Sequence, residues 1–335
     1  MAVEKLAIDF GNAVTKIYKL GAGMVLVEPT VAAVSSHESK SKVIGDQAKK
    51  LIGKTAEGTK IVFPIFEGDI VSEKVASNVL AGFMKKVEAG GKILGTKALV
   101  SVPCGVDGAL IKKLESVMGS VGITSVDFVE APILSAIGQN LTLTDFSPYF
   151  IIDMGAGNTN VAAVSLEGVI AGVSVNLGGN NIDTALIDYV ADNYGLFIGV
   201  ATAEKIKLKI GSLVEYDSLA TVVNGRDVTT GKPRSISLKA SEIYEVVKKY
   251  YDTVADIALK VLAKLPPEVS AEIRHSGIFV SGGTAGIYGL EDYYTDKFGM
   301  QISISDNPQT AIAFGGGMLL ADSKKLKKLK VKLDG

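Results

Sequence analysis

The chain has few of the residues that build disulfides and zinc sites. Its 335 residues include one cysteine, Cys104, two histidines, His37 and His275, and no tryptophan. A lone cysteine cannot form an internal disulfide, and a structural zinc site needs four Cys or His ligands. The sequence therefore favours a reducing compartment, which predicts a cytoplasmic protein, and it argues against structural zinc.

Long apolar runs and an excess of one charge are also missing. No run approaches the roughly 18 apolar residues of a membrane-spanning helix. The N-terminal MAVEKLAIDF enters a strand-like run at once, so we expect no signal peptide. Lys and Arg total 35 and Asp and Glu 36, and this net charge of −1 predicts no nucleic-acid partner. A content of 47% hydrophobic and 21% charged residues is typical of a globular protein, and the length suits two lobes.

Glycine, in contrast, is abundant, with 37 residues against 9 prolines. The glycines cluster at the ends of strand-like runs, where a backbone turns tightly or approaches a ligand. These clusters are Gly11, Gly155 with Gly157, Gly178 with Gly179, Gly282 with Gly283, and Gly315 to Gly317.

Two of these clusters belong to an internal repeat. Residues 5–18 read KLAIDFGNAVTKIY and residues 149–162 read YFIIDMGAGNTNVA. Each has an apolar strand, an Asp, a glycine turn, a Thr and a second β-rich run, which predicts a β-hairpin. Asp9 and Asp153 stand 144 positions apart, close to half the chain. The repeat predicts two related lobes that each open with such a hairpin.

The remaining patterns predict alternating helices and strands. Helices are expected over 71–87, 107–121, 132–141, 183–194, 203–210, 241–265 and 308–322. Strands are expected over 98–102, 126–129 and 277–280, and residues 219–238 should form two strands with a turn at Asn224-Gly225. The mixture indicates an α/β fold with a sheet in each lobe. No flexible linker separates the lobes, so they should share a cleft.

An Asp followed by a glycine turn suits phosphate chemistry. The backbone N–H groups of the turn can form a nest for phosphate oxygens, and the carboxylate can hold a hydrated Mg²⁺. Asp9 and Asp153 are the candidate carboxylates, and Thr15 and Thr159 would add hydroxyl donors. The alternative is an ordinary glycine hairpin, which a matched pair at half-chain spacing disfavours. The chain has no GxxxxGK[ST] P-loop, and its turns lead into strands, unlike a Rossmann fingerprint.

These motifs, in this order, resemble the actin/Hsp70/sugar-kinase superfamily and, within it, the MreB family of bacterial actins. The resemblance runs from about residue 5 to 322, and its most discriminating part is NGRD at 224–227 with GKPR at 231–234 and SEI at 241–243. It implies a two-lobed actin-like ATPase fold, with duplicated ribonuclease H-like domains and smaller inserted subdomains. The expected parts are a first lobe over 1–145 (subdomains IA and IB), a second over 146–322 (IIA and IIB) with hinge helix 308–322 returning to the first, and a basic tail over 323–335.

The resemblance also implies ATP or GTP with Mg²⁺ as cofactors and assigns their site. Asp9 and Asp153 would hold Mg²⁺ through water, and Glu204 and Lys207 would reach the ribose and adenine. Alone, the spacing of that last pair would favour a solvated ion pair on a helix, and the full order of motifs reverses this preference. The full set of expected nucleotide-binding residues is Asp9, Gly11, Asn12, Ala13, Thr15, Lys16, Asp153, Gly155, Ala156, Gly157, Asn158, Thr159, Gly179, Asn180, Asp183, Glu204, Lys207, Gly282, Gly283 and Thr284.

The chain departs from the family where water is positioned for hydrolysis. MreB-like chains carry a Glu directly before a Pro, and here the residue before Pro132 is Ala131. Glu130 is the remaining catalytic candidate, but neighbouring side chains at a strand end point to different sides. Asn160 also stands where the family often has an acidic residue. The sequence thus supports nucleotide binding better than turnover and predicts weak ATPase activity.

The resemblance implies a filament that assembles head to tail and organises cell shape and wall synthesis. A plasmid- or organelle-positioning actin, and a non-polymerising ATPase or small-molecule kinase of the same superfamily, stay open as alternatives. A peripheral position on the inner face of the membrane would use Ile93 and Leu94 in a glycine loop and the six lysines of 324–332. The alternatives for these segments are an inward-packed β-turn and a solvated end.

Overall fold

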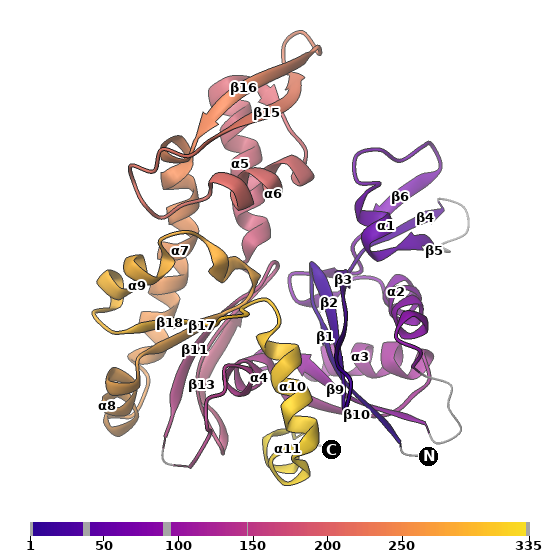
Figure 1. The fold of residues 1–335 in the computed structure, drawn as a ribbon, viewed down its shortest axis with the longest axis vertical. Coiled ribbons are helices and arrows are strands. Elements are labelled where there is room, and N and C mark those ends of the chain that lie inside the picture. Colours follow the sequence, from indigo (N-terminus) through magenta and orange to yellow (C-terminus); the bar gives the residue numbers. More distant parts are fainter. Residues whose placement is uncertain (1–2, 36–40, 90–94, 146, 333–335) are drawn as a thin grey trace.

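Two five-stranded sheets form the cores of two lobes (Figure 1). The computed structural model describes residues 3–35, 41–89, 95–145 and 147–332. In spatial order the first sheet contains β10 (Ile123–Glu130), β9 (Thr96–Val102), β1 (Glu4–Phe10), β2 (Val14–Lys19) and β3 (Gly23–Pro29). The second contains β13 (Gly168–Val175), β12 (Thr159–Ser165), β11 (Tyr149–Met154), β17 (Ile278–Ser281) and β18 (Ile302–Ile304).

The two sheets have the same topology, strand for strand. β1 pairs antiparallel with β2 and parallel with β9, and β11 pairs antiparallel with β12 and parallel with β17. The outer strands repeat the pattern. β3 pairs antiparallel with β2 and β13 pairs antiparallel with β12, whereas β10 pairs parallel with β9 and β18 pairs parallel with β17. The prediction of two related lobes, each opening with a hairpin, is confirmed.

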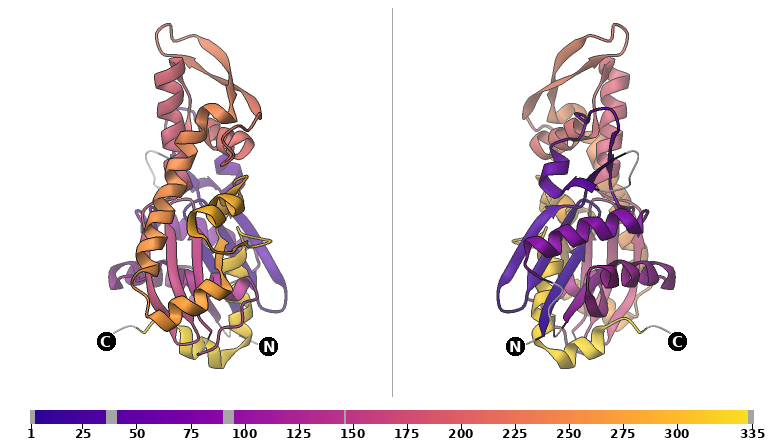
Figure 2. Two further views of the ribbon diagram at one scale, coloured as in Figure 1. Left: turned by 90° about the vertical axis from the view of Figure 1, so that its left-hand side faces the viewer. Right: turned by 90° about the vertical axis from the view of Figure 1, so that its right-hand side faces the viewer.

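Helices cover the outer faces of both sheets. In the first lobe α2 (Glu73–Lys86) and α3 (Gly108–Ser120) pack on the sheet (Figure 2). The Asp107 side chain caps α3 by accepting the Leu110 N–H. In the second lobe α7 (Ala240–Leu262) runs along the sheet beside α8 (Pro267–Ser276) and α9 (Leu290–Phe298). Both faces of the second sheet are covered, since every residue of β12 and all but the first of β11 are buried.

Two helices fill the space between the lobes. α4 (Ala131–Gly138) and α10 (Ala311–Ala321) pack with the inner faces of both sheets in one apolar cluster, which includes Leu99 and Ile151 (Figure 1). Helix 308–322 was expected to start at Pro308, but residues 307–310 form a turn and α10 begins at Ala311. The lobes therefore meet through a shared helical core.

A small subdomain extends from each lobe (Figure 1). The first has the sheet β5 (Ser41–Ile44), β4 (Ala32–Ser35) and β6 (Thr59–Val62), the helix α1 (Gly45–Lys49) and the hairpin β7 (Ile65–Phe66) with β8 (Asp69–Ile70). The second has β14 (Leu196–Phe197), β15 (Ala220–Asp227) and β16 (Pro233–Lys239) beside α5 (Gly179–Tyr194) and α6 (Val200–Ile210).

The predicted turn at Asn224-Gly225 is wrong. Both residues lie inside β15, where Asn224 pairs with Ser235 and Gly225 with Arg234. A Cβ on Gly225 would lie 2.6 Å from the Phe197 carbonyl oxygen, so glycine is needed for the close approach of β14. The chain reverses after Asp227 instead.

The basic tail is docked on the molecule. Its residues form α11 (Ser323–Leu329), whose Leu329 is buried. Lys328 pairs with Asp145 at 3.0 Å and Lys330 with Asp127 at 2.9 Å. Ile93 and Leu94, the other expected membrane contact, lie outside the described residues. Within the described ranges no helix has the length and apolar character that crossing a bilayer requires.

Candidate functional site

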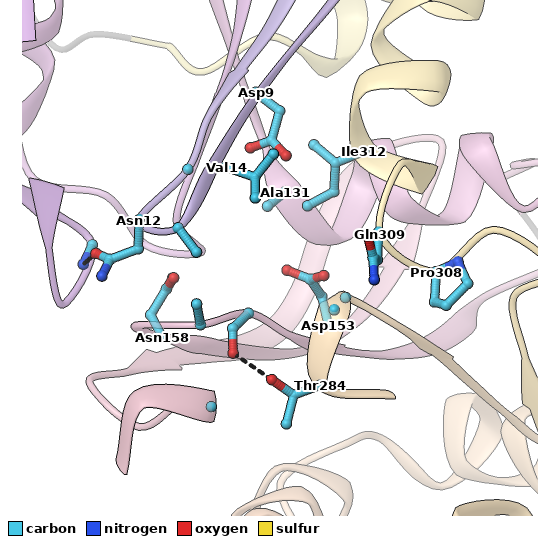
Figure 3. Close-up of a pocket in the computed structure, with 18 of the residues that line it drawn as sticks. Asp9, Asn12, Val14, Ala131, Asp153, Asn158, Thr284, Pro308, Gln309 and Ile312 are labelled. Atoms are coloured by element: carbon cyan, nitrogen blue, oxygen red, sulfur yellow. Dashed lines mark hydrogen bonds between the residues drawn. The ribbon is translucent and has the colours of Figure 1, made fainter. Parts of the chain in front are cut away.

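A cavity of about 600 Å³ opens where the two lobes and their subdomains face one another. Such a volume suits a ligand of nucleotide size. Its lining brings together most of the residues that the sequence predicted, from both halves of the chain (Figure 3). The predicted residues on the lining are Asp9, Gly11, Asn12, Ala13, Lys16, Asp153, Gly155, Ala156, Asn158, Gly179, Glu204, Lys207, Gly282, Gly283 and Thr284.

The two glycine turns meet at this cavity and have the same local geometry. A Cβ on Gly11 would lie 2.8 Å from the Val14 carbonyl oxygen, and one on Gly155 would lie 2.7 Å from that of Asn158. Each turn is therefore closed too tightly for a side chain at its first position. The turns also touch, because a Cβ on Gly157 would lie 2.4 Å from Cγ of Asn12. Together they present two sets of backbone N–H groups to one cavity.

Asp9 and Asp153 enter the cavity from opposite lobes (Figure 3). Asp9 accepts from Lys16 Nζ at 2.8 Å and from Ser101 Oγ at 3.0 Å. Asp153 accepts from Asn160 Nδ2 and Ser281 Oγ, both at 3.1 Å, and within the described residues no ion pair joins it to a Lys or Arg. Burial raises the pKa of Asp153 to about 6; the hydrogen bond from Asn160 opposes this shift, and the negative charge of Asp9 adds to it. A buried carboxylate pair of this kind favours a bound cation.

The second side of the cavity is lined by residues of α5, α6 and the loop after β17. Lys207 Nζ donates to the Gly179 carbonyl oxygen and to Asp183 Oδ2, both at 2.9 Å. Thr284 Oγ1 donates to the Gly155 carbonyl oxygen at 2.9 Å, which ties this loop to the second glycine turn (Figure 3). Glu204 pairs with Lys49 of α1 at 2.9 Å, so the two subdomains touch across the cleft.

The two predicted threonines turn away from the cavity. Thr15 shares a hydrogen bond of 2.8 Å with Thr30, and Thr159 donates to the Leu177 carbonyl oxygen at 2.6 Å. Both side chains are fully buried inside their lobes. Since side chains alternate along a strand, the neighbours of each threonine face the cavity instead.

Three further predicted residues, Gly157, Asn180 and Asp183, lie next to the cavity without lining it. Asp183 lies behind Lys207, and burial raises its pKa while the charge of Lys207 opposes the shift. It orients the lysine, and the lysine faces the cavity.

Comparison with known proteins identifies the family of this chain. The family model described as MreB/Mbl protein matches residues 3–328. The chain belongs to the MreB/Mbl family. It is 33% identical to the cell shape-determining protein MreB of Escherichia coli K12 over 326 residues, which covers 96% of this chain and 94% of that protein.

Solved structures agree with this MreB/Mbl assignment. The crystal structure of MreB5 of Spiroplasma citri bound to ADP matches with a TM-score of 0.90 and 26% identity, covering 97% of this chain and 98% of that one. The same protein bound to AMPPNP matches with a TM-score of 0.89 and 26% identity, covering 98% of each chain. The two-lobed actin-like fold expected from the sequence is confirmed.

In this MreB/Mbl chain, Ala131 faces the cavity and Glu130 does not line it (Figure 3). The Glu130 carboxylate accepts the Gly105 N–H at 2.7 Å, in the loop between β9 and α3. A methyl group therefore lines the cavity at the position where the resemblance led us to expect a carboxylate, and an alanine cannot orient water.

The sequence analysis missed several lining residues of this MreB/Mbl site. Ser101 lies one residue before the end of β9, which runs parallel to β1. The rule that the carboxyl ends of parallel strands share one edge of a sheet could have found it. Lys49 and Gln309 lie in a short helix and a turn that carry no local signal.

The donor set of this MreB/Mbl site fits Mg²⁺. No three His, Cys, Asp or Glu side chains gather into a metal-binding group within the described part of the chain. Mg²⁺ in nucleotide sites takes one or two carboxylates and completes its shell with water and phosphate oxygens. Asp9 and Asp153 supply that number of carboxylates beside turns suited to phosphate.

Proposed function

We propose that the protein is a nucleotide-binding bacterial actin that polymerises head to tail into cytoskeletal filaments. The observation that carries the proposal is the pair of glycine turns, each preceded by a carboxylate, on one cavity. ADP and AMPPNP bind to MreB5 of Spiroplasma citri, which supports ATP as the nucleotide here. The lobes would be residues 1–145 and 146–322.

In this proposal each group on the cavity has one task. The backbone N–H groups of the two turns bind phosphate oxygens, and Asp9 and Asp153 hold the waters of Mg²⁺. Bound Mg²⁺ neutralises the phosphates. Glu204 and Lys207 face the ribose and base from α6. Nucleotide that contacts both lobes closes the cleft, which selects the shape that assembles.

Assembly follows from the polarity of the subunit. A head-to-tail contact that does not close on itself gives an open filament, so one kind of subunit suffices. The name of the Escherichia coli relative, cell shape-determining protein, supports a role in organising cell shape. With Ala131 at the cavity, we propose that the filaments hydrolyse ATP slowly.

The test is nucleotide-dependent pelleting with electron microscopy of the pellet. We expect filaments with Mg²⁺-ATP and none with EDTA, and GTP in place of ATP tests the base. Asp153→Ala should bind Mg²⁺-ATP at least tenfold more weakly, since it removes one carboxylate of the site. Asp192→Ala, an exposed carboxylate on α5, is the matched control.

Nucleotide binding without a pellet would contradict the filament and favour a non-polymerising ATPase or kinase. Asp153→Ala with unchanged affinity in Mg²⁺ would contradict the site.

We also propose that the protein works at the cytoplasmic face of the membrane, through Ile93, Leu94 and the lysines of α11. Lys324, Lys325 and Lys327 are exposed on α11 and supply the attraction to anionic lipid. Replacing both Ile93 and Leu94 by Ser should reduce co-sedimentation with anionic liposomes and leave polymerisation intact. Unchanged co-sedimentation would assign the loop to packing.

A further inference from the structure

The Asp153 carboxylate is held by two buried donors on its two oxygens. Ser281 Oγ donates to Oδ1 and Asn160 Nδ2 donates to Oδ2, both at 3.1 Å. Ser281 is fully buried, Asn160 is 2% exposed and Asp153 is 4% exposed. A carboxylate offers about four lone-pair sites, so two remain after these bonds. Asp153 also lines the cavity, where those sites are free for a ligand.

The bond from Ser281 is the end of a one-way chain of hydrogen bonds that starts at Gln139, the residue that follows α4. A hydroxyl has one hydrogen, and that of Ser281 is used on Asp153. Ser135 must therefore be the donor in its contact of 2.6 Å with Ser281. Gln139 Nε2 in turn donates to Ser135 Oγ at 3.1 Å. These hydrogen bonds run from the end of the helix between the lobes, through β17, to the carboxylate.

Asn160 closes the network from the other side and joins the lobes. Its Oδ1 accepts the Cys104 N–H at 3.0 Å, and Cys104 follows β9 in the first lobe. One amide thus donates to Asp153 and accepts from the other lobe. A carboxylate at this position could only accept, and it would add a negative charge beside Asp153 and Asp9. An amide therefore satisfies both neighbours, which an acidic side chain cannot do.

We propose that Ser281 and Asn160 are positioning residues that orient the Asp153 carboxylate toward Mg²⁺-nucleotide. Ser135 and Gln139 connect the orientation of this carboxylate to the position of α4. The inference deepens the proposed function and rests on it. Donors that fix a carboxylate before the ligand arrives lower the cost of ordering it on binding. Their loss should reduce the part of the nucleotide affinity that depends on Mg²⁺.

The test compares the affinity for AMPPNP in Mg²⁺ and in EDTA, measured by calorimetry. In Ser281→Ala and Asn160→Ala, which each remove a donor without adding a charge, the gain in affinity that Mg²⁺ gives should fall about tenfold, the effect of one lost hydrogen bond to a charged group. The affinity in EDTA should stay within about threefold of wild type. In Ser135→Ala the Mg²⁺-dependent gain in affinity should fall by less than tenfold, because Ser281 still donates its own hydrogen to Asp153. Ser165→Ala, a buried serine farther along β12, should change neither value.

A second readout uses the single cysteine as a probe of the link between the lobes. Asn160→Ala removes the acceptor of the Cys104 N–H and should speed the reaction of the Cys104 thiol with a disulfide reagent. Asn160→Asp keeps that acceptor and should react like wild type. Comparing the two Asn160 variants separates its hydrogen bond to Asp153 from its hydrogen bond to Cys104, and the measurement needs no nucleotide.

The outcomes distinguish the inference from the function on which it rests. A wild-type protein that binds no AMPPNP in Mg²⁺ contradicts the proposed function. Wild-type binding with an unchanged Mg²⁺ gain in both Ser281→Ala and Asn160→Ala overturns the positioning roles alone. An equal loss in Mg²⁺ and EDTA also overturns them, since it indicates general damage to the cavity.

Discussion

Cys104 lies where the two lobes touch. Its side chain is 6% exposed, and its sulfur lies 2.7 Å from where a Cβ on Gly172 would stand. Burial raises the pKa of the Cys104 thiol to about 12, and the charge of Glu130 and a hydrogen bond to it act in the same direction. Thiolate is the reactive form, so this position keeps the only cysteine of the chain inert.

The native thiol should therefore react slowly, and faster as the pH rises. At pH 8 a pKa of about 12 in place of the usual 9.0 leaves roughly a thousandfold less thiolate. Rates with a chromogenic disulfide should rise without a plateau from pH 7 to 10 in the native protein. In urea the rate should level off above pH 9. A native rate that levels off near pH 9 would show that burial does not raise the pKa of the Cys104 thiol.

At the residue scale the sequence predicted the glycines and carboxylates of the cavity but misplaced the threonines. The alternation rule would have corrected this, because Val14 and Lys16 line the cavity and Thr15 stands between them. The same holds for Thr159, between Asn158 and Asn160. The motif shows which residues cluster in sequence, whereas strand geometry decides which of them face a ligand.

At the scale of elements, α4 and α10 cross backbone to backbone. A Cβ on Gly315 would lie 1.9 Å from the Leu134 carbonyl oxygen, and one on Gly138 would lie 1.9 Å from that of Ala311. Side chains at this crossing would push the helices apart. Because both lobes pack on these helices, the crossing sets how the lobes sit relative to one another.

Gly315→Ala should destabilise the protein by about 1–3 kcal/mol through overpacking. Gly119→Ala is the matched control, since it is also a helical glycine and its Cβ would meet nothing within 4 Å. That control should be neutral or stabilise by up to about 1 kcal/mol. Urea unfolding measures both. Equal stability of the two variants would contradict a tight crossing.

The long elements could be predicted from the sequence and the small ones could not. Strands such as β7 and β8 have two residues each and exist because the folded chain pairs them. Asn224-Gly225 carried a strong local turn signal, yet packing against β14 held it in a strand. Tertiary contacts outweighed local preference in both cases.

At the scale of the whole molecule, the duplicated topology places two similar hairpins on one cavity. The sheets share one topology, and each contributes a glycine turn and a carboxylate to the cavity between them. A ligand bound by both turns therefore reports on the relative position of the lobes. Under the proposed function, the lifetime of the closed shape would depend on how long the γ-phosphate survives, and the groups around that phosphate would then control assembly.

From Ala131 on the cavity lining we expect that lifetime to be long, and restoring a carboxylate should shorten it. Ala131→Glu should raise steady-state phosphate release above the critical concentration by about 10²–10⁴-fold, the usual contribution of one positioned acid or base. Nucleotide affinity should change little, because the two glycine turns and the Asp9 and Asp153 carboxylates on the cavity are unchanged. Filaments of the variant should disassemble sooner. Glu130→Gln tests the competing assignment, since it should leave phosphate release unchanged if Glu130 serves only the Gly105 N–H. Fast release in wild type that Glu130→Gln abolishes would make Glu130 the group that positions water.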